Sequence, residues 1–385
     1  MQYETIGALQ IILGVIARFW PVWIALAVIL ALSLSLKRYL GLYGHLFDTG
    51  VGIAGLMICF FWLFTAIFAD VIAPFDPLQQ IAIMKDAPPG AIDPNSGAVF
   101  LLGADRLARD VFSRVVFGSQ IVLVIAPAAT LFSLMVGSTL GLPAGYYGGR
   151  IDSLLSFLAN LVLAFPVILL FYLLVTPGIR ETPIPQWLAG VFFMFPIIFF
   201  GALFYTRFAG RPALLAALLA ATLLIGGWVY AGLVFDADPL GIISITSNQL
   251  NIFVAVVFAS SPGVFRIVRG LTLDIKTRDY VAAAQTRGES AWYIMLWEIL
   301  PNARGPLIVD TCLRIGYTTI LLGTLGYFGL GLAPESPDWG TAIKESSRLL
   351  RAHIHPALPP VIALMSFVLG LNLLADALRE QSLRD

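Results

Sequence analysis

The sequence has few charged residues for its length. Only 12% of the 385 residues are Asp, Glu, Lys or Arg, whereas a soluble domain carries about 25%. This number of charged residues cannot cover the whole surface of a chain this long in water. We therefore expect lipid to cover much of the protein surface. The formal net charge is +0 and no basic face is visible, which excludes a nucleic-acid partner.

Cysteine and histidine are also scarce. The two cysteines, Cys59 and Cys312, lie in apolar runs and are typical of small buried hydrophobic residues. No Cys or His spacing indicates a metal site, since His353 and His355 lie in a predicted loop. No Ser–His pair is expected at membrane depth, which argues against an intramembrane hydrolase. We therefore expect no metal, cofactor or catalytic residue on this chain.

What the sequence does have is long apolar runs, with 59% of its residues hydrophobic. A spanning helix needs about 20 mostly apolar residues, and about nine runs meet this requirement. The first run ends in a Lys-Arg pair and has no basic segment before it, so it is predicted to be a span and not a cleavable signal. The predicted fold class is all-α, a polytopic membrane helix bundle. The nine runs are 19–36, 51–71, 118–140, 153–175, 187–205, 213–235, 250–268, 307–330 and 358–375.

The distribution of Lys and Arg predicts the orientation of the chain. Residues 206–212 carry two Arg, whereas residues 236–249 carry two Asp and no cation. Placing the first of these loops inside puts the N-terminus outside and the C-terminus in the cytoplasm. The hydrophilic segment 72–117 is then outside, and its five prolines before residue 95 predict an extended loop. The hydrophilic segment 269–306 is then cytoplasmic.

The cytoplasmic segment 269–306 is predicted to form two short helices joined by a turn. The first helix is expected to begin near 277–279, where Thr or Asp can cap it. Gly288 permits a turn with positive φ, and Pro301 is expected to end the second helix. The small residues Ala282–Ala284 would let another surface approach closely, and an apolar face would dock into a groove of another protein. That apolar face comprises Trp292, Ile294, Trp297 and Leu300.

At this segment the sequence resembles the membrane subunits of ABC importers. Their motif is E-A-A-x3-G-x9-I-x-L-P, in which Ala282 here replaces the Glu and Glu298 the Ile. The peptide branch often shows a Y-V-x-A-A-x3-G…L-P-N form, which this chain fits. The matching residues are Tyr280, Val281, Ala283, Ala284, Gly288, Leu300, Pro301 and Asn302.

Further segments resemble the C-type permease subunits of dipeptide, oligopeptide and nickel importers. Residues 101–123 follow the form L-L-G-T-D-x-x-G-R-D-V-x-S-R-x-x-x-G, with Ala104 and Ala108 in place of Thr and Gly. The other matching segments are 73–77, 144–152, 326–340 and 372–380. The resemblance implies a six-helix core with three added helices, one at the N-terminus and two inserted. The implied division is an extra span in 1–50, a first core part in 51–175, an inserted pair in 176–249 and a second core part in 250–385.

The resemblance implies a permease subunit that moves peptides or similar small solutes across a bacterial or archaeal cytoplasmic membrane. It implies a second permease of B type, two ATPase subunits that bind ATP and Mg, and a periplasmic or lipid-anchored solute-binding protein. The sequence has no phosphate loop of the form GxxxxGK[ST], so another chain must hydrolyse ATP. The alternative is a secondary transporter, a fold that often shows an internal repeat, and we find no such repeat in the sequence. Dipeptides, oligopeptides, nickel complexes, opines and sugars all remain open as substrates.

In addition to the ATPase-coupling motif, two groups of polar residues are candidates for a functional role. Residues of the outer loop are expected to contact the binding protein or the partner permease, with a solvated helix end as the alternative. Asp310 and Arg314 stand four apart and would share a helix face, either as an ion pair that eases burial or as a gating pair. The outer-loop contacts are Arg109, Asp110, Ser113 and Arg114.

Overall fold

The computed structural model describes residues 3–175, 182–238, 240–241, 247–330, 336–347 and 350–382. Within these residues, eight helices are long and apolar enough to cross a membrane, and one bent helix pair could form a ninth crossing. Each predicted apolar run falls on one of these helices or on the bent pair. The prediction of an all-α membrane bundle is therefore confirmed.

The chain forms two compact units. Unit 1 comprises Met1–Pro127 and Cys312–Asp385, and unit 2 comprises Ala128–Thr311. The helices α6 (Val111–Tyr147) and α16 (Arg304–Phe328) each begin in one unit and end in the other. The remaining elements of unit 1 are α1 (Ala8–Arg18), α2 (Trp20–Leu36), η1 (Lys37–Tyr39), α3 (Gly41–His45), η2 (Leu46–Asp48), α4 (Gly50–Ile67), α5 (Ala69–Ile72), η3 (Ala82–Met84), β1 (Ala91–Ile92), β2 (Val99–Phe100), α17 (Trp339–Ser347) and α18 (Leu358–Ser382).

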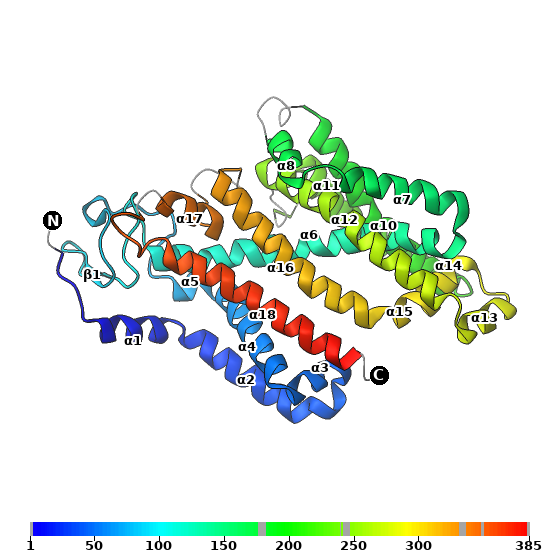
Figure 1. Ribbon diagram of the computed structural model, residues 1–385, viewed down its shortest axis with the longest axis horizontal. Helices are drawn as coiled ribbons and strands as arrows, with labels where there is room; N and C mark the ends of the chain where they lie inside the picture. Colours follow the sequence, from blue (N-terminus) through cyan, green and yellow to red (C-terminus); the bar gives the residue numbers. More distant parts are fainter. Residues whose placement is uncertain are drawn as a thin grey trace. The chain divides into compact units, whose positions relative to one another are not determined.

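In unit 1, α18 packs closely along α4, and Figure 1 shows the two helices side by side. A methyl group added at Gly55 of α4 would lie only 2.6 Å from the backbone nitrogen of Leu374. Trp62 fixes the register, because its Nε1 donates to Ser366 Oγ at 3.0 Å. Its ring meets that of Trp339 edge-on, with centroids 5.0 Å apart, so α17 is anchored to the same helix pair.

Residues 73–110 fold with residues 3–7 into a small layer, which we call the loop layer. β1 and β2 pair antiparallel, and the N-terminal segment adds to them through a hydrogen bond from Ile92 N to Glu4 O at 2.9 Å. The prediction of an extended loop over 72–117 is therefore wrong in part, because the layer has a buried core and 111–117 already belong to α6. That core comprises Met84, Ala87, Ala91, Phe100 and Ala104.

Unit 2 contains the rest of the helices. Its first pair, α7 and α8, is bent by 77°, so the predicted run 153–175 is not one straight helix. Pro166 lies in the break, where it cannot continue a helix hydrogen-bond ladder. The elements of unit 2 are α7 (Gly149–Leu163), α8 (Val167–Val175), α10 (Ile184–Phe208), α11 (Pro212–Phe235), α12 (Ser247–Ile275), α13 (Asp279–Thr286), α14 (Ala291–Tyr293), the π-helical η4 (Ile294–Ile299) and α15 (Leu300–Asn302).

In unit 2, a seam of glycines on α6 packs closely against α12. Gly137, Gly141 and Gly145 are spaced four apart, so they lie along one face of α6. A methyl group at Gly141 would lie 2.9 Å from Cβ of Val268, and one at Gly145 would lie 2.6 Å from Cβ of Thr272. Small residues at this spacing let two membrane helices approach to backbone contact. We call this contact the glycine seam.

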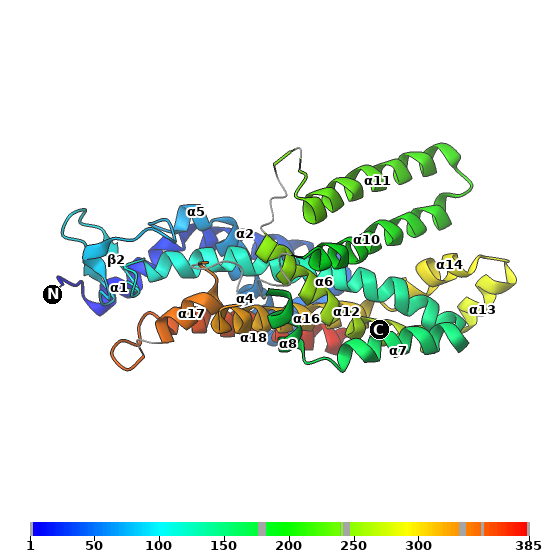
Figure 2. The ribbon, with the colours of Figure 1, turned by 90° about the horizontal axis from the view of Figure 1, so that it is seen from above.

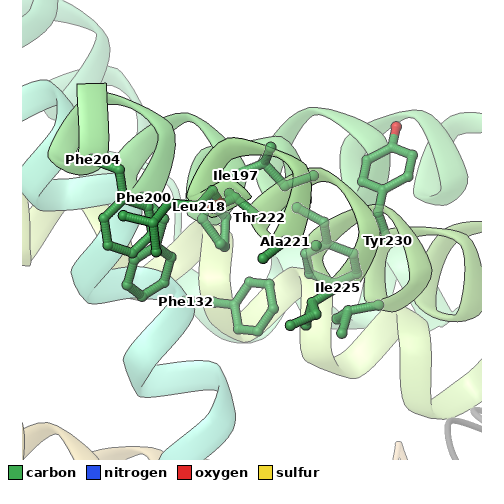
Figure 3. A pocket seen from close by; sticks show the side chains of 13 residues that line it. Phe132, Ile197, Phe200, Phe204, Leu218, Ala221, Thr222, Ile225 and Tyr230 are labelled. Carbon is green, nitrogen blue, oxygen red and sulfur yellow. Dashed lines mark hydrogen bonds between the residues drawn. The ribbon is translucent and has the colours of Figure 1, made fainter. Parts of the chain in front are cut away.

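The helices α10 and α11 form a hairpin, which Figure 2 shows as two long helices that lie side by side and run in opposite directions. An apolar groove of about 370 Å³ runs between them and reaches Phe132 of α6. Figure 3 shows Phe200 and Phe204 of α10 along this groove, with Leu218 and Ile225 of α11. Side chains of this kind suit contact with lipid chains.

We predict that Gly141→Ile destabilises the protein by about 3 kcal/mol or more, because the branched side chain cannot fit against Val268. The midpoint of thermal unfolding in detergent measures the effect. Gly270→Ala on α12 is the matched control, since an added methyl there meets nothing within 4 Å. Equal midpoints for the two variants would contradict the role of the glycine seam.

Candidate functional site

Within the predicted segment 269–306, residues 276–303 form two short helices joined by a turn, as the sequence predicts, and we call these residues the elbow. The predicted bounds are too wide, because residues 269–275 still belong to α12 and residues 304–306 already belong to α16. α13 begins at Asp279, after Arg278 as N-cap with no side-chain hydrogen bond to the helix end. The predicted capping by Thr or Asp is therefore wrong: Thr277 Oγ1 instead donates back to Asp274 O at 2.8 Å. The start of the elbow is fixed by the end of α12, not by a cap of its own.

Gly288 makes the turn of the elbow. Its φ is +79°, a conformation that glycine adopts without strain, so the predicted positive φ is confirmed. Ser290 then caps α14 by accepting a hydrogen bond from Tyr293 N at 3.3 Å. The turn is exposed, and a methyl added at Gly288 would meet nothing within 4 Å. The chain itself therefore leaves the space around the turn open.

The motif residues divide between the surface and the interior of the elbow. Tyr280, Ala283, Gly288, Pro301 and Asn302 are exposed, and Leu300 is half-buried. Ala284 is fully buried against the core of the elbow. It cannot face a partner, contrary to the expectation for Ala282–Ala284, because it occupies the inner face of α13.

The apolar face predicted for the second helix is also partly wrong. Ile294 is 1% exposed and packs inward, whereas Trp292 is exposed and Trp297 and Leu300 are half-buried. The six residues of η4 wind as a π-helix, a rare form that is frequent at functional sites. The buried core that results joins the elbow to α12 and α6 and comprises Val281, Ala284, Ile294, Met295, Leu296, Ile299 and Ala303 with Leu142, Val264, Val268, Ile275 and Leu307.

A second polar site lies in unit 1, where two arginines are buried with two carboxylates. Arg109 and Arg114 are 1% and 2% exposed. Asp105 Oδ2 accepts from Arg109 Nε at 2.8 Å and from Arg114 Nη1 at 2.7 Å. Glu345 Oε2 accepts from both guanidinium groups, at 2.7 Å from Arg114 Nη1. A cavity of about 480 Å³ beside this cluster is lined by Asp105, Arg106, Leu107, Arg109, Lys344 and Glu345.

Asp110 and Ser113 form the beginning of α6. Asp110 Oδ2 accepts from Ser113 N at 2.8 Å and from Ser113 Oγ at 2.7 Å, which satisfies groups that a helix start leaves free. Ser113 Oγ also accepts from Phe75 N at 3.2 Å and so holds the loop layer. Burial raises the pKa of Asp110 to about 6, although the hydrogen bonds from Ser113 lower it.

All four predicted outer-loop contacts are thus buried within this chain. A solvated helix end, the alternative interpretation for Arg109, Asp110, Ser113 and Arg114, is wrong because these side chains hold the loop layer and α17 together. Contact with a partner stays a prediction. Arg106 and Leu107 are the exposed neighbours that a partner would meet first.

Asp310 and Arg314 both lie in α16, and one helical turn separates them. Among the described residues, no group of three or more His, Cys, Asp and Glu side chains could hold a metal ion.

Comparison with known proteins identifies the family of the chain. Residues 137–383 match the family described as the binding-protein-dependent transport system inner membrane component. The chain belongs to this family. The permease is therefore a multi-pass membrane component of a transport system, and the matched region includes the elbow and α17.

Three relatives illustrate the likeness. The dipeptide transport system permease protein DppC of Haemophilus influenzae is 29% identical over 327 residues, which is 85% of this chain and 88% of the relative. The glutathione transport system permease protein GsiD of Pectobacterium atrosepticum is 29% identical over 279 residues, 72% and 70% of the two chains. A di/tripeptide transport system permease protein of Pseudomonas aeruginosa is 28% identical over 332 residues, 85% and 86%.

The permease compensates for one of its departures from the ABC-importer motif. Glu298 replaces the Ile of the motif, and its Oε1 accepts from Arg287 Nη2 at 3.0 Å. This ion pair links the turn to η4 and, being half-exposed, is worth at most about 1 kcal/mol. A departure from the C-type form of residues 101–123 carries strain: Ala108 in the loop layer stands in place of a glycine and has a φ of +60°, which costs an L-residue roughly 1–2 kcal/mol.

We predict that Asp105→Asn destabilises the permease by about 3–5 kcal/mol, because it leaves Arg109 and Arg114 buried with one carboxylate. Thermal unfolding in detergent measures this. Asp70→Asn, at an exposed residue of α5, is the control and should change the midpoint little. A loss no larger than that of the control would show that the cluster does not depend on Asp105.

We predict a pH-dependent effect for Asp110→Asn. The pKa of Asp110 rises from 3.8 to about 6 on folding, so its contribution to stability is full below pH 3.8. That contribution is lost as the pH rises through about 6, a change of about 3 kcal/mol. The Asn variant should therefore gain stability over the wild type at pH 8 and not at pH 4.5.

Asp93→Asn should respond to pH in the opposite way, because hydrogen bonds from Ser96 and Asn95 lower the pKa of Asp93. Its carboxylate stabilises the fold above pH 3.8, so the Asn variant should lose stability at pH 8. Parallel responses of the two variants would contradict the assignment of Asp110.

Proposed function

We propose that this chain is the transmembrane permease subunit of an ATP-driven importer for peptides or similar small solutes, and that it has no ATPase activity of its own. The exposed elbow carries the proposal: it presents Tyr280, Ala283 and Gly288 outward on a rigid turn, with Pro301 and Asn302 exposed at the end of the second helix. A compact apolar-edged knob of this kind suits insertion into a groove of an ATPase subunit.

The substrate class is proposed from the relatives. Their names specify dipeptides, di/tripeptides and glutathione, so a short peptide or a peptide-like solute is the substrate that we propose. The specificity would then reside mostly in a separate solute-binding protein. Nickel complexes, opines and sugars are the alternatives that a transport assay would test.

We propose that the N-terminus is outside and the C-terminus cytoplasmic. The arginines of the 206–212 loop and the cations of the elbow then lie on the cytoplasmic side, in accord with the positive-inside rule. The loop layer is then on the outer side, where the binding protein would dock, and the 480 Å³ cavity lined by Arg106 and Glu345 lies beside it.

The complete transporter that we propose contains a second permease, two ATPase subunits that bind ATP and Mg, and the solute-binding protein. ATP binding would close the ATPase subunits and move the elbow. The membrane helices would then exchange between inward-facing and outward-facing states, since a ligand that binds one state better shifts the equilibrium toward it.

We predict that Gly288→Glu abolishes ATPase association and uptake. The substitution strains a residue at φ +79° and places a charge on the docking surface. Co-purification of the ATPase subunits and uptake of labelled dipeptide into proteoliposomes measure the two effects. Gly210→Glu is the control, since it adds the same charge at an exposed loop glycine with open space around it. Uptake and association that survive Gly288→Glu would refute the docking assignment.

A further inference from the structure

The hairpin of α10 and α11 makes a specific contact with the elbow. Arg207 Nη1 donates to Tyr293 Oη at 2.9 Å, and the Arg207 guanidinium carbon lies 5.0 Å from the ring centre of Trp297. Trp297 Nε1 in turn donates to Thr206 Oγ1 at 3.2 Å. Two consecutive residues of α10 therefore hold two aromatic side chains of the elbow, and we call these four residues the brace.

Apolar packing continues the contact beneath the brace. Phe199, Ala202 and Leu203 of α10 pack against the same buried core that contains Ile294 and Ile299 of the elbow. Because Tyr293 and Trp297 stand four apart, both reach the side of the second helix that faces α10. The contact therefore combines a cation–π interaction, two hydrogen bonds and a shared apolar core.

The hairpin is built to act as one body. A methyl added at Gly226 of α11 would lie 2.8 Å from Ile197 of α10, and Gln186 Nε2 donates to Val234 O at 3.0 Å at the far end. The membrane-spanning window of α11 is 0% buried within the chain, so α11 mainly supports α10. A displacement of the elbow that the brace transmits would thus reach a long membrane hairpin.

We propose that the α10–α11 hairpin is a positioning device that couples the elbow to the membrane helices, and this rests on the proposed function of the elbow. The brace keeps η4 attached to α10 when the ATPase moves the elbow, so the movement reaches the bundle and is not absorbed by bending of the elbow. Thr206, Arg207, Tyr293 and Trp297 are the positioning residues. The opposing interpretation is a hairpin that only fills space beside the bundle.

The test is the ratio of dipeptide molecules transported to ATP molecules hydrolysed, measured for the complete transporter in proteoliposomes. Arg207→Ala removes the cation–π contact and one hydrogen bond, so we expect the ratio to fall on the order of tenfold. Arg207→Lys keeps a cation over the ring and should recover part of the ratio. Arg211→Ala, at an exposed arginine four residues further along the chain, is the matched control and should leave the ratio unchanged.

Two milder variants keep the proposal testable if Arg207→Ala does not assemble. Thr206→Val removes the hydrogen bond from Trp297 with little change of shape, and Trp297→Phe removes the same hydrogen bond with a smaller aromatic ring. Each should lower the ratio. Their double variant should be no worse than the poorer single variant, because both act on one contact. Unchanged ratios in these variants, with the ATPase still bound, would overturn the brace.

A second readout separates this proposal from the proposed function, because it needs no ATPase. Arg287 lies in the exposed turn of the elbow, and its peptide bond is open to trypsin when the elbow loosens. In the purified full-length chain, Arg207→Ala should speed cleavage after Arg287 about fivefold and Arg211→Ala should not. If Arg207→Ala speeds cleavage but the wild-type chain binds no ATPase subunit in the co-purification assay, the brace is retained and the docking role is refuted. Equal cleavage in both variants would refute the brace.

Discussion

The position of the elbow depends on the glycine seam between α6 and α12. Because Gly141 and Gly145 have no side chains, the two backbones approach closely enough for Val268 and Thr272 to meet α6 directly. α12 leads straight into the elbow, and Lys276 Nζ donates to the carbonyl oxygen of Gly145 at 2.8 Å. The first residue of the elbow is thus tied to the last glycine of the seam. A larger side chain at Gly141 or Gly145 would clash with α12 and force the two helices apart.

Ion pairs fix the orientation of the helices that this apolar packing brings together. Arg269 of α12 binds Asp152 of α7, with Nη2 2.6 Å from Oδ2, so α12 is held from a second side. In unit 1 the buried cluster around Asp105 fixes the loop layer to α17. Buried ion pairs lose much of their attraction to desolvation, so their contribution lies more in a single arrangement than in net stability. The ion pairs accordingly fix the arrangement of the loop layer against α17.

Much of the fold could be predicted because the length of an apolar run identifies a membrane-spanning helix. The turn at Gly288 was predictable for a similar reason, since glycine is the residue that tolerates positive φ. The bend at Pro166 could have been anticipated from the proline itself. Which side of η4 faces inward could not be predicted, because the π-helical winding of Ile294–Ile299 changes the angle between successive side chains.

The burial of Arg109 and Arg114 could not be predicted from the sequence, for a different reason. Their partner Glu345 is more than 200 residues away in sequence, and no local pattern reports such a pairing. The contact of Arg207 with Tyr293 also joins residues that are far apart in sequence, at a separation of 86 positions. Helix positions follow from local composition, whereas the polar contacts that orient the site come from tertiary packing.

The central claim is that the elbow docks an ATPase subunit with one face of α13 outward. Neighbouring residues Ala283 and Ala284 offer the sharpest test, since the first is exposed and the second buried. Each is replaced by cysteine in a chain in which Cys59 and Cys312 are serine, and a short thiol cross-linker is added to the assembled transporter. We expect Ala283→Cys to cross-link to the ATPase and Ala284→Cys to give no product. Equal products from both positions, or none from Ala283→Cys in an active transporter, would contradict the account.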